Sequence, residues 1–458
     1  MYNIKKLWQR EQPYEPVTGQ STDDEREDDD EIQPTTGFSW LEYLVFLTLG
    51  VAMLWAWNML LAAGPYFQRR FSSSAWISHN FQAAELSVSS ITNLGSMVIL
   101  SKMQAKASYS RRIVVALIMN IIAFTLLALS TTVLSGIEAD AYFVFIICIV
   151  FTTSLATAFC QNGVFAFVAG FGQERYTQGI MTGQAVAGVL PCIAQIVSVL
   201  SVRKGPPPAP HSDVDDAATD RPGPPPVPSK AAFAYFLTAT AISVFTLVAF
   251  IYLLRRHQRS KAALSGLATS ISSLVEHERK PVPFSVLFRK LRWLAGGVFI
   301  TFAITMFFPV FTQMILSVRD PAVTSPILHP PSFIPLAFLF WNSGDLLGRL
   351  IPALPQLSLT SRPKLIFVLA ISRVIFIPLY QLCNIRGHGA IVNSDVFYLV
   401  VVQLLFGMSN GYVGSICMMG ASEWVDPEER EAAGGFMGMC LVAGLAAGSL
   451  ASFFAAGA

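Results

Sequence analysis

The chain has 458 residues, of which 53% are hydrophobic and 13% are charged, and its mean hydropathy is +0.53. A soluble domain carries about 25% charged residues, so this composition excludes a protein that hides its apolar side chains in a water-soluble core. The net charge of +2 comes with no basic stripe and interleaved aromatic residues, which argues against a nucleic-acid partner. The composition therefore predicts an integral membrane protein with many spans in the lipid bilayer.

The chain begins with a polar stretch, residues 1–37, that contains the acidic run DDEREDDDE and no apolar periodicity. Such a segment cannot bury enough apolar surface to fold, so we expect a disordered acidic tail in the cytosol. It also lacks the early apolar segment of a cleaved signal peptide.

Apolar stretches of spanning length follow this tail. A membrane-spanning helix needs about 20 mostly apolar residues. A scan with that length predicts eleven transmembrane helices and hence an all-α integral membrane protein. The predicted spans are residues 38–63, 78–101, 112–135, 141–170, 176–202, 231–255, 291–317, 332–354, 364–384, 394–419 and 432–456.

Two loops stand out between these spans. Residues 203–230 are Pro-rich and favour an extended tether on the outside or in a lumen. Residues 256–290 form a basic loop, expected in the cytosol, where its charges could set the topology or contact anionic lipid. This loop is predicted to separate an N-terminal six-helix bundle at 38–255 from a C-terminal five-helix bundle at 291–458.

The distribution of basic residues predicts the orientation. Most Lys and Arg residues between the spans fall on the same side of the membrane as the N-terminus. Because basic residues gather in cytosolic loops, we expect a cytosolic N-terminus and, after eleven spans, a C-terminus outside or in a lumen.

The six cysteines all lie in or at the ends of apolar segments, and none has C-x-x-C spacing. They predict neither a disulfide framework nor a metal site. We expect no cofactor.

The stretch WNSGDLLGRL, residues 341–350, places two full charges inside an apolar run. Asp345 and Arg349 are four residues apart, so on a helix they lie on one face, about 6 Å apart along the axis. Each charge in mid-membrane costs about 2.5–3.5 kcal/mol, and pairing lowers that cost but rarely removes it. The pair therefore indicates either a substrate-facing cavity or a buried link that fixes the packing of two helices.

Further polar side chains lie in the spans of both halves. Each one alone is typical of an interhelical hydrogen bond, but their spread over both halves favours a central pathway. Amide and indole groups suit a neutral ligand that carries hydroxyl groups. The residues are Trp57, Asn58, Glu85, Gln161, Asn162, Gln184, Arg373 and Asn410.

Glu85 differs from these residues because it is an acid within the second predicted span. Burial disfavours the charged form of a carboxyl group, so Glu85 could titrate near neutral pH and couple transport to protons. It could equally pair with Arg373 or face the mouth of a cavity.

Small residues recur at helical spacing in GIMTGQAVAG (179–188), AAGGFMGM (432–439) and AGLAAGS (443–449). Gly and Ala at every third or fourth position let helices approach closely. We expect tight helix packing there, on surfaces that would also let two bundles rock.

The chain resembles the equilibrative nucleoside transporters in seven stretches that follow the family's order from the first span to the eleventh. Ala56 departs from the family pattern, which usually has Pro before the first-span Trp. The Pro-rich loop and the acidic tail are similar to those of fungal members, some of which act in the vacuolar membrane. The stretches are WAWNMLLAAGPYF (55–67), QNGVFAFVAGF (161–171), YTQGIMTGQAVAG (176–188), WNSGDLLGRL (341–350), SRVIFIPLYQLCNIRG (372–387), FGMSNGYVGSICM (406–418) and PEEREAAGGFMG (427–438).

The resemblance implies a fold related to the major facilitator superfamily, with bundles of six and five helices that alternate access to a central site. Asp345 and Arg349 match the eighth-span motif at that site, where the Arg side of the pair engages ribose hydroxyls. Gln161 matches a residue that contacts the base, and Trp57 and Asn342 match cavity positions. The implied function is facilitated diffusion of purine and pyrimidine nucleosides, by a protein expected to be a monomer in the vacuolar or plasma membrane.

Other functions were weighed against this one. Proton-coupled nucleoside or nucleobase transport is one alternative, and a facilitator of another polar solute such as a sugar is a second; a nucleobase carrier would have no ribose for Asp345 and Arg349 to bind. The stretch SGDLLG is similar to a sequence element of intramembrane aspartyl proteases. The chemistry of those enzymes needs two carboxylates that share a proton, and Glu85 carries no matching motif. We therefore expect no enzymatic activity and no catalytic residue.

Overall fold

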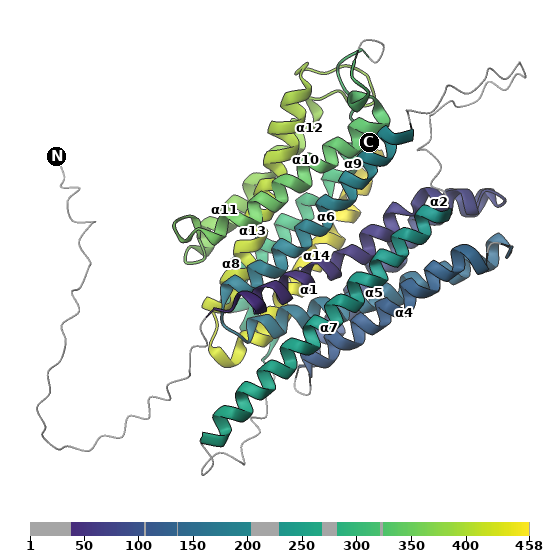
Figure 1. The fold of residues 1–458 in the computed structure, drawn as a ribbon. Helices are drawn as coiled ribbons and strands as arrows, with labels where there is room; N and C mark the ends of the chain where they lie inside the picture. Colours follow the sequence, from purple (N-terminus) through teal and green to yellow (C-terminus); the bar gives the residue numbers. More distant parts are fainter. Residues whose placement is uncertain are drawn as a thin grey trace, which may run out of the picture. The chain divides into compact units, whose positions relative to one another are not determined.

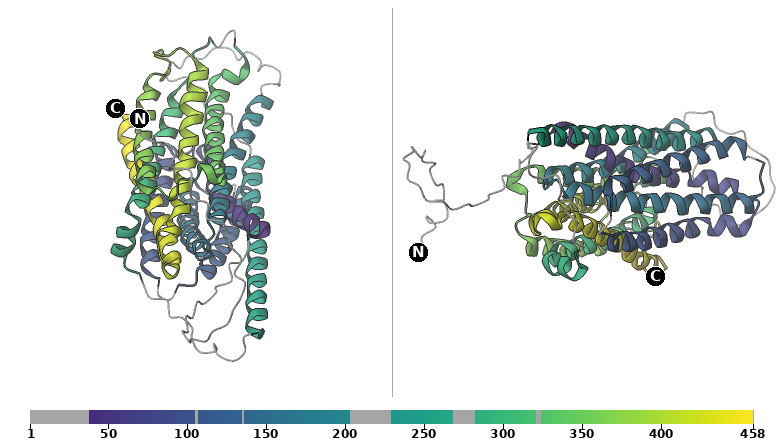
Figure 2. Two further views of the ribbon diagram at one scale, coloured as in Figure 1. Left: turned by 90° about the vertical axis from the view of Figure 1, so that its left-hand side faces the viewer. Right: turned by 90° about the horizontal axis from the view of Figure 1, so that it is seen from below.

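The computed structural model describes residues 38–104, 107–134, 136–202, 229–267, 282–320 and 324–457, and nearly all of them are helical. The described residues from Ser39 onward form one compact unit. Most of the long helices run roughly along one direction (Figure 1 and Figure 2). The α-helices are α1 (Trp40–Ala62), α2 (Gly64–Arg70), α3 (Ala75–Lys102), α4 (Tyr109–Val133), α5 (Ala139–Ala169), α6 (Glu174–Val202), α7 (Ser229–Leu267), α8 (Phe284–Thr305), α9 (Phe307–Met314), α10 (Pro330–Leu350), α11 (Pro363–Ser372), α12 (Phe376–Gln381), α13 (Leu405–Gly420) and α14 (Arg430–Gly457).

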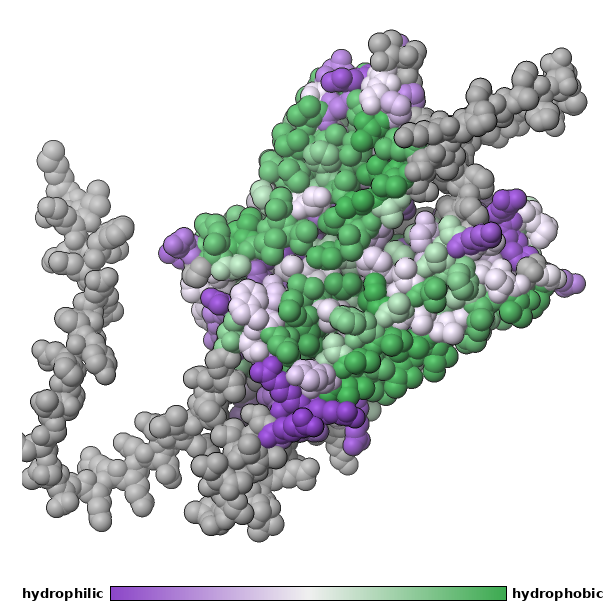
Figure 3. All heavy atoms as spheres, in the orientation of Figure 1, coloured by the Kyte–Doolittle hydropathy of each residue, from purple (hydrophilic) through white to green (hydrophobic). Residues whose placement is uncertain are grey.

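Within these residues, 10 helical stretches are long and apolar enough to cross a membrane, and they cover ten of the eleven predicted spans. The remaining predicted span, 332–354, is the helix α10, which has 21 residues. It is less apolar than the others because it carries Asp345 and Arg349 together with several small polar residues. Figure 3 shows apolar residues along the sides of the helices and hydrophilic residues gathered toward their ends. The chain is an all-α membrane protein, as predicted.

The basic loop predicted at 256–290 is shorter than expected. Helix α7 continues to Leu267, and α8 begins at Phe284. The segment RRHQRSKAAL contains Arg, Lys, Gln, Ala and Leu, which all favour the helix, and no Gly or Pro interrupts it. The predicted acidic tail, residues 203–228 of the predicted Pro-rich loop at 203–230, and residues 268–281 of the basic loop lie outside the described residues.

Two predicted spans are interrupted where a proline falls inside them. Helix α8 ends at Thr305, four residues before Pro309, and α9 begins at Phe307. The same happens between α11 and α12, where a 3₁₀ turn at Arg373–Ile375 separates the two helices just before Pro378. Proline has no N–H to donate to the carbonyl four residues earlier, so the α-helical ladder breaks at these points.

The helices pack mainly within two groups. In the first, α1 lies on α6 and α7, α4 on α5 and α7, and α3 on α5. In the second, α10 lies on α13, and α8 on α11, α13 and α14. Each group has its own apolar cluster of aromatic and aliphatic side chains. Contacts between the groups are made by α6 with α10 and α13, and by α14 with α3 and α5.

The segments of small residues are points of close helix contact, as predicted. A Cβ atom on Gly183 of α6 would lie 2.0 Å from the carbonyl oxygen of Leu47 in α1. One on Gly434 of α14 would lie 2.2 Å from the carbonyl oxygen of Phe165 in α5. No side chain fits in such a space, so glycine is what allows these backbones to touch.

Candidate functional site

The two charges predicted to share a face of one helix form an ion pair on α10. Arg349 Nε donates to Asp345 Oδ2 at 2.8 Å, and both side chains are buried. The helix begins with two prolines, whose fixed φ suits a first turn, and it ends before Pro352. Arg349 therefore lies in the last turn of α10, with Asp345 one turn before it.

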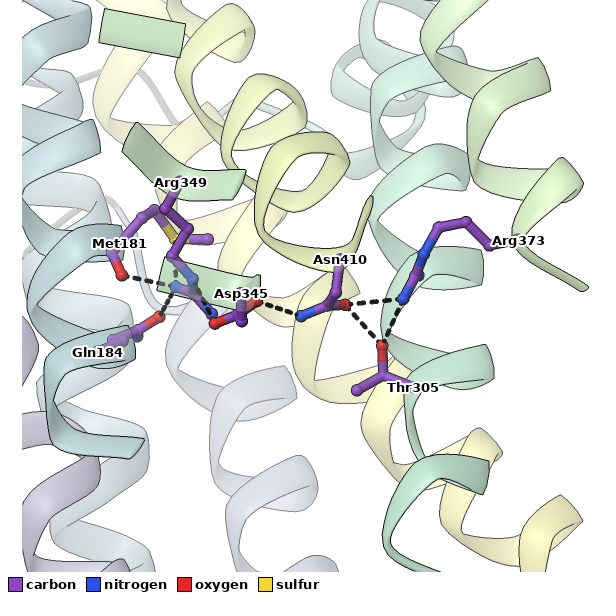
Figure 4. Close-up of polar contacts among 7 residues, drawn as sticks. All are labelled: Met181, Gln184, Thr305, Asp345, Arg349, Arg373 and Asn410. Carbon is purple, nitrogen blue, oxygen red and sulfur yellow. Dashed lines mark hydrogen bonds and ion pairs between the residues drawn. The ribbon is translucent and has the colours of Figure 1, made fainter. Parts of the chain in front are cut away.

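Arg349 also binds the neighbouring helix α6. Its Nη1 donates to the carbonyl oxygen of Met181 at 2.7 Å and to Oε1 of Gln184 at 3.1 Å (Figure 4). In return, Nε2 of Gln178 donates to the carbonyl oxygen of Arg349 at 3.1 Å. The guanidinium thus connects the two groups of helices at the contact of α6 with α10.

Asp345 binds the helix on its other side, α13. Its Oδ1 accepts a hydrogen bond from Nδ2 of Asn410 at 2.7 Å. The amide oxygen of Asn410 accepts from Thr305 Oγ1 at 2.5 Å and from Arg373 Nη2 at 3.2 Å. Figure 4 shows these residues in a row from α6 through α10 and α13 to Arg373.

Arg373 ends this row in a buried site where all its partners are neutral. It donates to the carbonyl oxygen of Thr301 at 2.5 Å, to Thr305 Oγ1 at 3.0 Å and to Ser409 Oγ at 3.0 Å. Its guanidinium carbon lies 5.0 Å from the ring centroid of Phe406. The alternative that Arg373 pairs with Glu85 is therefore wrong for this structure, since its donors are taken up within its own group of helices.

The row holds two guanidinium groups and one carboxylate. Asp345 contacts Arg349 directly and faces Arg373 through the amide of Asn410. A buried charge is costly unless its hydrogen bonds are made, and here neutral amides, hydroxyls and backbone carbonyls make them. The arrangement is a donor-rich polar centre with one strong acceptor.

Four glycines bring α10 and α13 close enough for this row to form. A Cβ atom on Gly344 of α10 would lie 2.1 Å from the carbonyl oxygen of Leu404, and one on Gly411 of α13 would lie 2.0 Å from that of Asp345. Gly348 and Gly407 make the same kind of contact. The backbones touch at Asp345, so the short side chain of Asn410 can reach its carboxylate.

Asn342 is the third predicted site residue on α10 and lies on the side of α6. Its Nδ2 donates to the carbonyl oxygen of Phe338 at 2.9 Å and contacts Sγ of Cys192 at 3.5 Å. A Cβ atom on Gly188 would lie 2.3 Å from its Oδ1. Asn342 and Arg349 therefore both face α6, two turns apart.

The remaining predicted site residues lie on three other helices. Gln161 on α5 and Glu85 on α3 are buried, and each has a side-chain oxygen, Oε1, without a hydrogen-bond partner among the described residues. Trp57 on α1 is half-buried and packs against the apolar cluster of the first helix group. No hydrogen bond or ion pair between described residues joins these three side chains to the row of polar residues that runs from α6 to Arg373.

Sequence reasoning left several members of the row out of the predicted site. Gln184 and Asn410 are polar residues in apolar spans, and this signal was visible in the sequence. Thr305 is a common residue in membrane helices, where its hydroxyl usually bonds within its own helix. Met181 takes part through its backbone carbonyl, for which the sequence carries no signal.

Comparison with known proteins identifies relatives along most of the chain. The sequence model of a family described as "Nucleoside transporter" matches residues 146–456. Nucleoside transporter FUN26 of Saccharomyces cerevisiae is 30% identical over 455 residues, which cover 90% of this chain and 83% of that protein. Equilibrative nucleoside transporter 1 of Rattus norvegicus is 29% identical over 470 residues, which cover 90% of this chain and 96% of that protein.

Solved structures with a similar fold belong to the major facilitator superfamily. The proton:xylose symporter XylE superposes with a TM-score of 0.56 at 11% identity, covering 90% of this chain and 86% of that chain. FucP in the outward conformation superposes with a TM-score of 0.51 at 15% identity, covering 93% of this chain and 96% of that chain. At this identity the likeness concerns the fold alone, and it confirms the predicted fold class.

The family match spans more than half of the chain, and the 30% identical relative covers nine-tenths of it. The family and the fold are those of transporters. The chain therefore belongs to the nucleoside transporter family, and the equilibrative nucleoside transporters are among its relatives.

Proposed function

We propose that this protein moves purine and pyrimidine nucleosides across a membrane by facilitated diffusion, with Asp345 and Arg349 at the substrate site. The observation that carries the proposal is the buried ion pair on α10, in a chain of the nucleoside transporter family. A ribose presents two adjacent hydroxyl groups. The carboxylate of Asp345 can accept from one of them, and the planar fork of Arg349 can donate to both.

Substrate binding would compete with the contact between α6 and α10. Nη1 of Arg349 is taken up by the carbonyl oxygen of Met181 and by Gln184. A ribose hydroxyl that accepts from Arg349 would replace one of these acceptors on α6. Binding and release of substrate would thereby change the contact between the two helix groups, which is what alternating access requires.

The other predicted residues would recognise the base. Gln161 has a buried amide oxygen without a hydrogen-bond partner in the described part of the chain, and an amide can both donate to and accept from the edge of a base. Trp57 offers an aromatic ring, and Asn342 offers an amide on the same face of α10 as Arg349. These roles extend the site across α1, α5 and α10.

The proposal includes the arrangement in the membrane. Bundles of six and five helices, at 38–255 and 291–458, would move against each other around this site. The N-terminus would lie in the cytosol and the C-terminus outside or in a lumen, in the vacuolar or plasma membrane. The protein would act as a monomer, without a cofactor and without enzymatic chemistry.

The test is uptake of labelled uridine and adenosine by liposomes that contain the purified full-length protein. Wild-type protein should take up both, and Arg349→Lys should take up neither, because an ammonium group is a point charge without the guanidinium fork. Arg362→Lys is the matched control, because Arg362 is exposed at the start of α11. Wild-type uptake equal to that of empty liposomes, or unchanged uptake by Arg349→Lys, would contradict the proposal.

Proton-coupled transport is the second candidate, and the position of Glu85 favours it. Glu85 is buried on α3, and its Oε1 has no hydrogen-bond partner among the described residues. An acid in such a site favours its neutral form, so a modest fall in pH can protonate it. Coupling predicts that uptake rises when the pH on the outer or lumenal side falls.

The pH dependence of uptake separates the two candidates. Under proton coupling, Glu85→Gln should remove the rise in uridine uptake at low pH, while Glu138→Gln, at an exposed position before α5, should retain it. Equal wild-type uptake at pH values one or two units apart would leave facilitated diffusion as the mechanism.

A further inference from the structure

A second polar site lies away from the row that contains Asp345 and Arg349, at the junction of three helices of the first group. A cavity of about 670 Å³ is bounded by the end of α3, the start of α4 and the second half of α5. This volume falls in the range of about 300–1,000 Å³ that small-molecule sites occupy. Among the described residues, three basic ones line it, Lys102, Arg111 and Arg112, and no acidic one does.

Two of these three cations are free to bind a ligand. Lys102 and Arg111 have no hydrogen-bond or ion-pair partner among the described residues. Arg112 is held in place instead: it donates to the carbonyl oxygen of Met103 at 2.7 Å and also binds the side chain of Asn162 in α5. Arg112 therefore fixes the walls of the cavity, and Lys102 and Arg111 supply the unpaired charge.

The start of α4 adds to the positive potential. This helix has 25 residues, and its N-cap, Ser108, lines the cavity and makes no capping hydrogen bond with its side chain. The first turn of a helix carries unpaired N–H groups and the positive end of the helix dipole. Together with two unpaired cations, this turn favours a phosphate group.

The other side of the cavity is apolar and lies on the lipid-facing surface of α3. Ile99 and Met103 line it and are 60% and 61% exposed, and Phe159 of α5 is half-buried beside them. In a membrane these side chains contact acyl chains. A soluble anion would leave this apolar side unused, whereas a phospholipid would use both sides.

We propose that this cavity binds one anionic phospholipid, with its headgroup phosphate between Lys102 and Arg111 and an acyl chain along Ile99 and Met103. The ends of α3 and α4 that form it are predicted to lie on the cytosolic side. Anionic lipids are concentrated in that leaflet, and basic pockets between membrane helices bind their headgroups. The bound lipid would join α3, α4 and α5 at one end of the first helix group.

Native mass spectrometry of the full-length protein in neutral detergent tests this inference. Phosphatidylserine and phosphatidylcholine with identical acyl chains are added separately, and the affinity of the first bound lipid is measured. Wild-type protein should prefer phosphatidylserine, and Lys102→Ala/Arg111→Ala should lower its affinity for that lipid by about 30-fold. The affinity for phosphatidylcholine should fall less, because its choline group offsets the charge of its phosphate. Lys102→Gln/Arg111→Gln, which removes both charges but keeps a polar end and part of each aliphatic stem, should give the same loss.

Arg362→Ala/Lys364→Ala is the matched control. It removes another basic pair, at the start of α11, that is expected on the same side of the membrane but lines no part of this cavity. It should leave the affinity for phosphatidylserine unchanged. An equal loss in the control pair would point to general surface charge and overturn the proposal.

Two further results would also overturn it. The first is equal affinity for phosphatidylserine in wild-type protein and in both variants of Lys102 and Arg111. The second is displacement of phosphatidylserine by millimolar inorganic phosphate, which would identify a site for a soluble anion. Because the readout is lipid binding, none of these results depends on whether the protein transports nucleosides.

Discussion

Asn410 is the residue that makes a single network out of two buried cations and one buried acid. Its amide nitrogen donates to Asp345, and its amide oxygen accepts from Arg373 and Thr305. A side-chain amide donates with its nitrogen and accepts with its oxygen, so one residue on α13 serves both sides. Asp345 thereby contacts Arg349 directly and is linked to Arg373 through the amide of Asn410.

Asn410→Leu should destabilise the protein. The change leaves Oδ1 of Asp345 and Nη2 of Arg373 without one partner each, at a cost of about 1–3 kcal/mol for each buried group. We expect a clearly lower melting temperature in detergent, measured by intrinsic fluorescence. Asn393→Leu, at an exposed position, should leave the melting temperature unchanged. Equal melting of the two variants would refute the structural role of the Asn410 amide.

The sequence predicted the pair on α10 but not its partners. Asp345 and Arg349 are four residues apart, so helix geometry alone places them together. Their partners on α6 and α13 come from segments far away in the chain, and Met181 contributes only a carbonyl group. Such contacts depend on how the helices are docked, and no local pattern encodes that.

At the scale of helices, the same limit applies to boundaries and breaks. The apolar windows placed the spans well because lipid demands about 20 apolar residues in each. The windows missed the breaks at Pro309 and near Pro378, where an apolar run continues although the α-helical ladder does not. They also missed the continuation of α7 to Leu267, because that part of the helix is polar.

The contact of α10 with α13 depends on glycine at Gly411. A Cβ atom there would lie 2.0 Å from the carbonyl oxygen of Asp345, so Gly411→Ala should force the two helices apart. We expect a lower melting temperature and loss of uridine uptake, since the row from Arg349 to Asn410 would no longer close.

Gly95→Ala is the control for this substitution. Gly95 is also inside a helix, α3, but a Cβ atom there has nothing within 4 Å. Alanine is favoured over glycine in a helix by up to about 1 kcal/mol, so this variant should melt at the same or a higher temperature. If Gly411→Ala and Gly95→Ala have the same melting temperature, the close contact of α10 with α13 is not what holds the site together.

At the scale of the whole molecule, the substrate-site candidate lies where the two helix groups meet. The groups touch through α6 with α10 and α13, and through α14 with α3 and α5. Arg349 takes part in the first of these contacts through Met181 and Gln184. A transporter of this fold must open such contacts on one side of the site at a time, so a residue that binds both substrate and the opposite group links recognition to movement.

The most direct test of this account is whether the protein recognises the ribose hydroxyls. In liposomes that contain wild-type protein, unlabelled uridine and 2′,3′-dideoxyuridine are compared as inhibitors of labelled uridine uptake. A hydrogen bond to a charged group contributes about 1.5–3 kcal/mol, so loss of two hydroxyls should raise the inhibitory concentration about 100-fold or more. Equal inhibition by uridine and 2′,3′-dideoxyuridine would show that Asp345 and Arg349 do not bind the ribose, and would contradict the account.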